Sequence, residues 1–306
     1  MQGKLEGSDA MDQRKLMRFV QGAELLACPV CGEALSVAGT ALRCSAGHSF
    51  DIARQGYVNL LTDSHRNQSY DRASFEKRRE VFASGIYDGI ADALCEIVGE
   101  HAAGKEFAAD GERADANGCL RVLDAGCGEG YFARAVAART AAQVAAFDIS
   151  KDSVQLAAGA DAADGIAWFV ADLAAIPVRD HAIDCVLDVF SPAHYGEFRR
   201  VLAPEGIVVK VVPTENHLSE LRERAAGQLA HDGYSNERVI EHFEESCELV
   251  STRRVSRTQE LSPEALEALV AMTPLLFHVD RAAIDWTDVR EITVEADILI
   301  GRFLQG

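Results

Sequence analysis

The chain lacks the features that mark a membrane-spanning or secreted protein. No run of about 18 apolar residues, the length that a membrane helix needs, occurs among its 306 residues. The first residues, MQGKLEGSDAMDQRKLMRF, are charged where a signal peptide would be apolar. These absences predict a cytoplasmic protein with no membrane partner. With 48% hydrophobic residues, the chain can bury one large domain and a small one.

Basic residues are also scarce, at 30 Lys and Arg against 48 Asp and Glu, for a net charge of −18. Such a balance argues against indiscriminate attraction to phosphate backbones. The average conceals an asymmetry, because residues 1–80 hold 11 basic and 10 acidic residues and the acidic excess lies in the rest. If the protein contacts nucleic acid, we expect the N-terminal part to make the contact.

Cysteine is sparse except in one stretch, CPVCGEALSVAGTALRCSAGH, at residues 28–48. The spacing Cys-x2-Cys, twelve residues, Cys-x3-His can bring two ligand pairs to one ion, and thiolates with an imidazole favour zinc. Four protein ligands leave no position for water, so the predicted role is structural. Gly39-Thr40 between short apolar runs predicts a hairpin. The predicted ligands are Cys28, Cys31, Cys44 and His48, and we expect the scattered Cys95, Cys119, Cys127, Cys185 and Cys247 to be small buried residues.

Two segments after the cysteine stretch have simple expectations. Apolar spacing in SFEKRREVFASGIYDGIADALCEIV predicts helix, with a break at Gly85. Residues 101–119 are small and polar without periodicity, which predicts a linker or surface loop and a domain boundary.

A glycine-rich turn follows an apolar strand in LRVLDAGCGEGYFARAVAAR. Glycines there let the backbone approach a ligand at a helix N-terminus, although Gly-x-Gly alone is weak evidence. The dinucleotide fingerprint needs glycine at position 131, where Tyr131 stands, and the Asp-x-Gly-x-Gly-x-Gly pattern is instead that of loops binding the methyl donor S-adenosylmethionine (SAM). A second strand ends in Asp148, twenty residues after Gly128, where a carboxylate can accept hydrogen bonds from ribose hydroxyls.

Further apolar strands alternate with helices, which predicts a doubly wound parallel sheet with ligands at the carboxyl ends of its strands. Asp124, Asp148 and Asp172 all fall at such ends, and the alternative role for each is capping a helix. LVSTRRVSRTQEL and REITVEADILIGRFL alternate with period two and predict an antiparallel pair that completes the sheet. The predicted fold class is α/β, a class I SAM-dependent methyltransferase with a Rossmann-like, mainly parallel seven-stranded sheet and a small N-terminal zinc-binding domain.

Taken together, the motifs resemble those of the bacterial 23S rRNA guanine-N1 methyltransferases. The likeness rests on CPVC…C…GHSFDIARQGYVNLL, RREVFASGIYDGI, VLDAGCGEGYF, FSP at 190–192, NHLSELR and ALVAMTPLLFH. It implies methyl transfer from SAM to N1 of a guanine in 23S rRNA, zinc on the four ligands above, and a donor lying over the glycine loop with Tyr87 and His217 facing its pocket. The domains then expected are an N-terminal extension at 1–27, a zinc-binding, RNA-recognition domain at 28–64, a helical connector and linker at 65–118, and the methyltransferase domain at 119–306. The SAM-binding residues implied are Tyr87, Asp124, Gly126, Gly128, Gly130, Tyr131, Asp148, Asp172 and His217.

Several points stay open in the sequence. Phe277 stands where the family usually has tryptophan. No residue is assigned as the base that takes the N1 proton, because Asp188 and His194, the candidates near the fourth strand, are more simply explained as structural. The alternatives are a SAM-dependent methyltransferase of a small molecule or protein, or a catalytically silent zinc- and SAM-binding module; a homodimer is also left open. RNA contacts are expected from Arg54, Arg66, Arg72, Arg78 and Arg79, with Tyr57 or Tyr70 stacking on a base.

Overall fold

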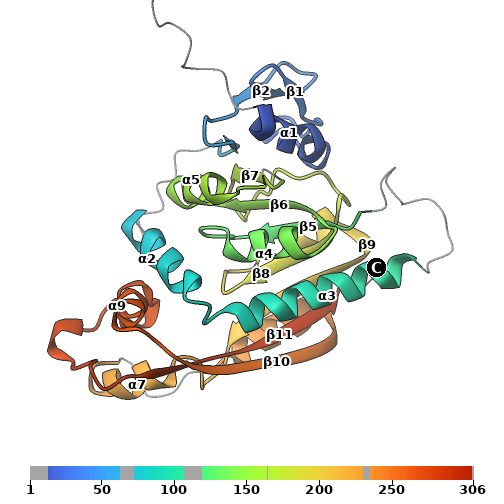
Figure 1. Ribbon diagram of the computed structural model, residues 1–306. Helices are drawn as coiled ribbons and strands as arrows, with labels where there is room; N and C mark the ends of the chain where they lie inside the picture. The colour runs from blue at the N-terminus through green and yellow to red at the C-terminus, as the bar shows by residue number, and fades with distance from the viewer. Residues whose placement is uncertain (1–12, 63–71, 107–118, 164, 230–234, 305–306) are drawn as a thin grey trace, which may run out of the picture.

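The computed structural model describes residues 13–62, 72–106, 119–163, 165–229 and 235–304 (Figure 1). Two sheets organise this part of the chain, a small antiparallel one near the N-terminus and a large mixed one that carries most of the core. None of the helices within these ranges is both long and apolar enough to cross a membrane.

The large sheet has eight strands in the order β10-β11-β9-β8-β5-β6-β7-β4. The strands from β9 to β4 run parallel, and β11 is antiparallel to both β9 and β10. This confirms the mainly parallel sheet with its antiparallel pair. The bounds are β4 Tyr57–Asn59, β5 Arg121–Ala125, β6 Gln143–Asp148, β7 Ala167–Val170, β8 Ile183–Val189, β9 Leu202–Pro213, β10 Glu248–Glu260 and β11 Glu291–Arg302.

The predicted count of seven strands is wrong by one. The eighth strand, β4, comes from the segment assigned to the zinc unit and pairs in parallel with β7, Tyr57 facing Trp168. Three residues are too short a run for sequence periodicity to reveal. The segment assigned to the zinc unit is therefore joined to the large sheet by backbone hydrogen bonds.

Helices cover both faces of the sheet, because its strands are apolar on both sides. Successive residues such as Val122 and Leu123 point into two separate hydrophobic clusters, one on each face. The first cluster packs against α3 and α4 and the second against α1, α6 and α8. The helices are α1 Gln13–Gly22, α2 Arg72–Ala83, α3 Asp88–Glu106, α4 Tyr131–Arg139, α5 Lys151–Ala160, α6 Tyr195–Val201, α7 Ser219–Ala225, α8 Glu237–Ser246 and α9 Pro263–Met272.

The small sheet contains β1 Ser36–Ala38, β2 Ala41–Arg43 and β3 Ser49–Asp51. The turn between β1 and β2 contains Gly39 at φ +65°, which confirms the predicted hairpin. Within the expected N-terminal extension, residues 13–22 form α1, an amphipathic helix whose Phe19 is buried. In Figure 1 the small sheet and α1 lie beyond the end of the large sheet where β7 and the edge strand β4 are found.

The break between α2 and α3 falls where the sequence predicts it, with Gly85 at φ +80°. The predicted linker at 101–119 begins too early, because α3 continues to Glu106. The stretch HAAGKE looks loop-like but contains good helix formers that extend the helix once its earlier turns are packed. Residues 107–118 of that linker lie outside the described residues.

Candidate active site and metal centre

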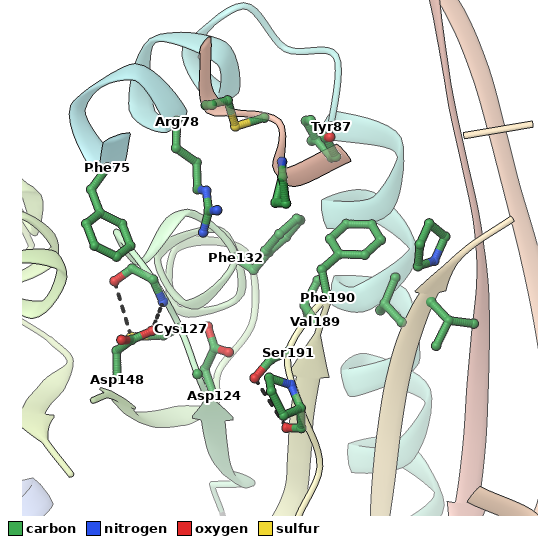
Figure 2. Close-up of a pocket in the computed structure, with 18 of the residues that line it drawn as sticks. Phe75, Arg78, Tyr87, Asp124, Cys127, Phe132, Asp148, Val189, Phe190 and Ser191 are labelled. Atoms are coloured by element: carbon green, nitrogen blue, oxygen red, sulfur yellow. Dashed lines mark hydrogen bonds between the residues drawn. The ribbon is translucent and has the colours of Figure 1, made fainter. Parts of the chain in front are cut away.

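A cavity of about 820 Å³ opens at the carboxyl ends of the central parallel strands (Figure 2). Its floor comes from the ends of β5, β6, β8 and β9 and from the loops that follow them. Residues of α2, the last residue of α9 and residues 273–275 that follow it also line the cavity, and these two helices pack against each other. The position is that expected for a ligand in a doubly wound sheet.

The glycine loop after β5 requires glycine for space as well as for backbone angle. Gly126, Gly128 and Gly130 all have positive φ. A Cβ on Gly126 would lie 2.1 Å from Ser191 Oγ, and one on Gly130 would lie 2.4 Å from the Trp168 ring. Gly126 and Gly128 line the cavity, whereas Gly130 lets the start of α4 pack on Trp168.

Asp148, the last residue of β6, is held by the loop that it faces. The backbone N–H of Gly128 donates to its Oδ2 at 2.9 Å and that of Ser150 to its Oδ1 at 2.8 Å. Burial raises the pKa of this carboxyl. The cap of α5 is Ser150, so the capping alternative does not apply to Asp148. A carboxylate has about four acceptor positions, which leaves capacity for ribose hydroxyls.

Asp124, in β5, is 2% exposed, and its Oδ2 has no hydrogen-bond partner among the described residues. Burial raises its pKa to about 7, and the nearby charges of Asp148 and Asp188 act in the same direction. A buried carboxyl oxygen without a hydrogen-bond partner in a cavity wall is costly unless a ligand supplies that partner. The ammonium of an amino-acid-bearing cofactor such as SAM would supply that partner.

The remaining predicted SAM contacts divide into two groups. Asp172, just beyond β7, lines the cavity and accepts a hydrogen bond from Ala174 N–H at 2.9 Å in a turn, with no helix to cap. Gly130 and Tyr131 are not among the residues that line the cavity as described, so their contact with the donor stays a prediction. The Tyr131 hydroxyl donates instead to Asp88, and its ring stacks on Phe82 at 4.7 Å.

Tyr87 and His217 meet at the other end of the cavity, as the resemblance implies. The His217 Nδ1 lies 3.1 Å from the Glu295 carbonyl oxygen, so Nδ1 carries the hydrogen and Nε2 accepts from the Tyr87 hydroxyl at 3.4 Å. Burial lowers the pKa of His217 to about 4 and raises that of Tyr87 above its usual value. Both side chains are therefore neutral at pH 7.

The two residues considered as bases are held in structural roles. Asp188 is wholly buried and accepts a hydrogen bond from Lys210 Nζ at 2.8 Å. His194 caps α6, its Nδ1 accepting from Glu197 N–H at 3.1 Å. Sequence reasoning overlooked Lys210, which lines the cavity; the available signal was a single lysine inside the apolar strand GIVVKVV.

The four predicted metal ligands converge in the N-terminal unit, by which we mean residues 26–60. Their ligand atoms all lie within 4.8 Å of one another. The Sγ atoms of Cys31 and Cys44 are 3.7 Å apart, and His48 Nδ1 lies 3.5 Å from Cys28 Sγ and 3.4 Å from Cys44 Sγ. Tetrahedral zinc with bonds of about 2.3 Å to sulfur and about 2.0 Å to nitrogen needs separations of about 3.8 and 3.5 Å. The residues therefore fit a closed, structural zinc site.

Only some of the residues that were expected to contact RNA are exposed among the described residues. Arg54 and Arg79 are exposed, Arg72 pairs with Glu76 at 2.9 Å, and Arg78 lines the cavity. Tyr57 is buried in β4, so its predicted stacking on a base is wrong. Arg66 and Tyr70 lie outside the described residues. Phe277 is 39% exposed and is not part of the cavity wall as described.

Comparison with known proteins supports both the predicted zinc-binding unit and the predicted methyltransferase domain. Residues 26–68 match the zinc-ribbon model described as RlmA, N-terminal, and residues 122–206 match a methyltransferase domain. YxjB of Bacillus subtilis, assigned by its name to the 23S rRNA (guanine-N(1)-)-methyltransferases, is 34% identical over 90% of this chain and 95% of its own length. A similarly named protein of Micromonospora griseorubida is 35% identical, over 91% of this chain and 96% of its own. The 23S rRNA (guanine(748)-N(1))-methyltransferase of Streptomyces fradiae is 33% identical, over 90% and 96%.

Proposed function

This chain belongs to the family of 23S rRNA (guanine-N(1)-)-methyltransferases, and we propose that it transfers the methyl group of SAM to N1 of a guanine in 23S rRNA. The observation that carries the proposal is the cavity at the carboxyl ends of the strands, where the glycine loop and the buried Asp124, whose Oδ2 has no hydrogen-bond partner among the described residues, line one wall. The proposed substrate places the enzyme in the cytoplasm.

The cavity residues fit SAM by their chemistry. Asp148 would hold the ribose hydroxyls, Asp124 the ammonium, and Asp172 the adenine amino group, while Gly126 and Gly128 allow close approach of the backbone. When bound, SAM supplies a methyl group on a positively charged sulfur, which is already a strong electrophile. The protein's task is to hold the acceptor nitrogen in line with that methyl group.

Guanine N1 lies on the base-pairing edge and carries a proton, so the target base has to be unpaired and must lose that proton. Phe75, Phe82 and Phe132 give the cavity an apolar wall that excludes water around the reacting atoms. Neutral His217 and Tyr87 add no competing charge there. The closed zinc site has no position for substrate, so its role is to hold the N-terminal unit in shape.

The rRNA contacts are proposed for the N-terminal unit and α2, because the N-terminal part of the chain lacks the acidic excess of the rest. Arg54 is exposed on the N-terminal unit, and Arg79 is exposed on α2 beside the cavity. Arg78 reaches the cavity from the same helix, where Figure 2 shows it above the glycine loop. An N-terminal part without acidic excess beside an acidic body favours one orientation of the RNA and limits non-specific binding.

The test is transfer of labelled methyl from SAM to protein-free 23S rRNA by the purified protein, followed by nucleoside analysis. We expect label in N1-methylguanosine, and we expect none with an Asp148→Ala variant, which lacks the proposed ribose contact. Label that enters a metabolite or protein extract but not the RNA would overturn the proposal in favour of a methyltransferase of small molecules or proteins. Absence of SAM binding by calorimetry would indicate a catalytically silent module.

A further inference from the structure

Phe190 occupies an unfavourable position with no evident structural benefit. It follows β8 directly and has φ +53°, a left-handed conformation that residues with a Cβ rarely adopt. Phe190 is 37% exposed and lines the cavity. Strained backbone and exposed apolar surface that coincide at a cavity are typical of a functional position.

Two aromatic rings lie near Phe190, and part of its surface stays exposed. The Tyr87 ring approaches edge-on with its centroid 6.1 Å away, and the His217 ring centroid lies at 5.5 Å. Figure 2 shows the labelled Phe190 and Tyr87 at the same end of the cavity. The other phenylalanines of the cavity wall are less available, since Phe82 stacks on Tyr131 and the rest are buried, namely Phe75, Phe132 and Phe147.

A buried ion pair holds the turn that carries Phe190. Lys210 Nζ, on the neighbouring strand β9, donates to Asp188 Oδ2 at 2.8 Å and also to the Ser191 carbonyl oxygen. The side chains of Lys210 and Asp188 are 5% and 0% exposed. The Phe190 N–H donates to the Val211 carbonyl of the same strand at 3.2 Å. Contacts on both sides of Phe190 therefore fix its strained backbone.

The same turn touches the methyl-donor loop. Ser191 Oγ occupies the space where a Cβ on Gly126 would lie, so the two loops are in van der Waals contact. In an in-line transfer, the acceptor nitrogen approaches the methyl carbon to about 3–3.5 Å. A base positioned by Phe190 would therefore lie next to the donor.

On the premise of the proposed function, we propose that Phe190 is the surface on which the unpaired target guanine stacks, and that Lys210 with Asp188 is the positioning pair that holds its ring. Proteins commonly bind unstacked RNA bases on aromatic side chains. Phe190 contacts the substrate in this account, whereas Lys210 acts through the turn.

Activity measurements separate stacking from cofactor binding. Stacking on an aromatic ring contributes about 1–3 kcal/mol per base, equivalent to about 5-fold to 150-fold in binding. Phe190→Leu should therefore lower kcat/KM for protein-free 23S rRNA by about 10-fold or more and leave the Kd for SAM within about threefold. Phe190→Tyr, the matched variant that keeps a ring, should retain most of the activity.

Lys210→Met removes the hydrogen bonds to Asp188 and Ser191 but keeps the length of the side chain. It should reduce activity as Phe190→Leu does, again with little change in the Kd for SAM. Because this variant leaves Asp188 buried without its cation, Asp188→Asn/Lys210→Met is the companion that removes both charges. Full activity of the double variant would overturn the positioning role, and so would a loss of SAM binding equal to the loss of activity.

A fluorescence measurement tests stacking without methyl transfer. In Phe190→Trp, guanosine 5′-monophosphate added with S-adenosylhomocysteine should quench the new tryptophan. The unsubstituted chain, with Trp168 and Trp286, is the matched control and should change little. If the nucleotide quenches the tryptophan of Phe190→Trp but the unsubstituted chain does not methylate rRNA, the proposed function is refuted while position 190 remains a stacking surface. Two results would overturn the stacking role of Phe190 in a chain that methylates rRNA. One is the absence of quenching in Phe190→Trp, and the other is full activity of Phe190→Leu.

Discussion

At the scale of single residues, the buried acids of the cavity determine how SAM binding should depend on pH. Burial raises the pKa of Asp124 to about 7, so near neutral pH the free protein holds this group partly protonated. The ammonium of SAM favours the ionised carboxylate. Binding should therefore release protons, and affinity should fall as pH drops below the pKa of Asp124.

Calorimetric titration with SAM at pH 7 and pH 6 checks this expectation. The Kd should rise about fivefold between these two values, a range in which the ligand's ammonium stays protonated. Asp124→Asn should bind more weakly and lose the pH dependence, while Asp188→Asn should keep it at a lower pH, because loss of that neighbouring charge lowers the pKa of Asp124. A Kd for the unsubstituted chain that does not change with pH would contradict the role given to Asp124.

The sequence predicts the acids of the site better than its other residues. Asp124, Asp148 and Asp172 could be placed because carboxyl ends of parallel strands meet at one edge. Lys210 and Phe190 could not, because their roles depend on a turn geometry and an ion pair that span two strands. The left-handed turn at Phe190 has no glycine to reveal it.

At the scale of elements, α1 is joined to both the N-terminal unit and the catalytic sheet by one arginine. Arg18 Nη1 donates to the Gly56 carbonyl at 2.8 Å, and Nη2 lies 3.6 Å from Asp161 Oδ2. Asp161 also accepts from the Trp168 indole N–H at 3.0 Å. The Arg18 side chain is 0% exposed, so its contacts are shielded from water.

Arg18→Met should therefore lower the free energy of unfolding by about 3 kcal/mol, because it leaves a buried acid without its cation. Arg14→Met, which changes an exposed arginine of the same helix, should change it by less than about 0.5 kcal/mol. Urea denaturation followed by circular dichroism measures both. Equal effects of the two substitutions would mean that Arg18 does not join these elements.

Zinc removal tests whether the N-terminal unit depends on the metal. The unit has little core of its own, so chelation should increase amide exchange across residues 26–60 by orders of magnitude. Methylation of rRNA should be lost, while the Kd for SAM should stay within about threefold because the ligands lie outside the cavity wall. Hydrogen-exchange mass spectrometry and calorimetry provide the two readouts. Unchanged exchange in the metal-free protein would count against a structural zinc site.

Long apolar runs allowed most elements to be predicted, and the exceptions have physical causes. β4 is a three-residue strand whose pairing with β7 is a tertiary contact. The last turns of α3 consist of small and polar residues whose helical state follows from the helix before them.

At the scale of the whole molecule, the uneven charge should appear in the salt dependence of rRNA methylation. Removal of one arginine that binds a phosphate should reduce the slope of log(kcat/KM) against log(salt) by about one. Arg54→Ala should show this decrease and weaken activity most at low salt. Arg238→Ala, an exposed arginine on α8, is the control and should leave the slope unchanged. If both substitutions have the same effect, the N-terminal unit does not contact the RNA.

The most direct test of the whole account is mass mapping of methylated guanine in 23S rRNA from cells with and without the gene for this chain. The account predicts one guanine that carries a methyl group on N1 only when the gene is present. Identical methylation patterns in the two rRNAs, or a gene-dependent methyl group on another atom, would contradict it.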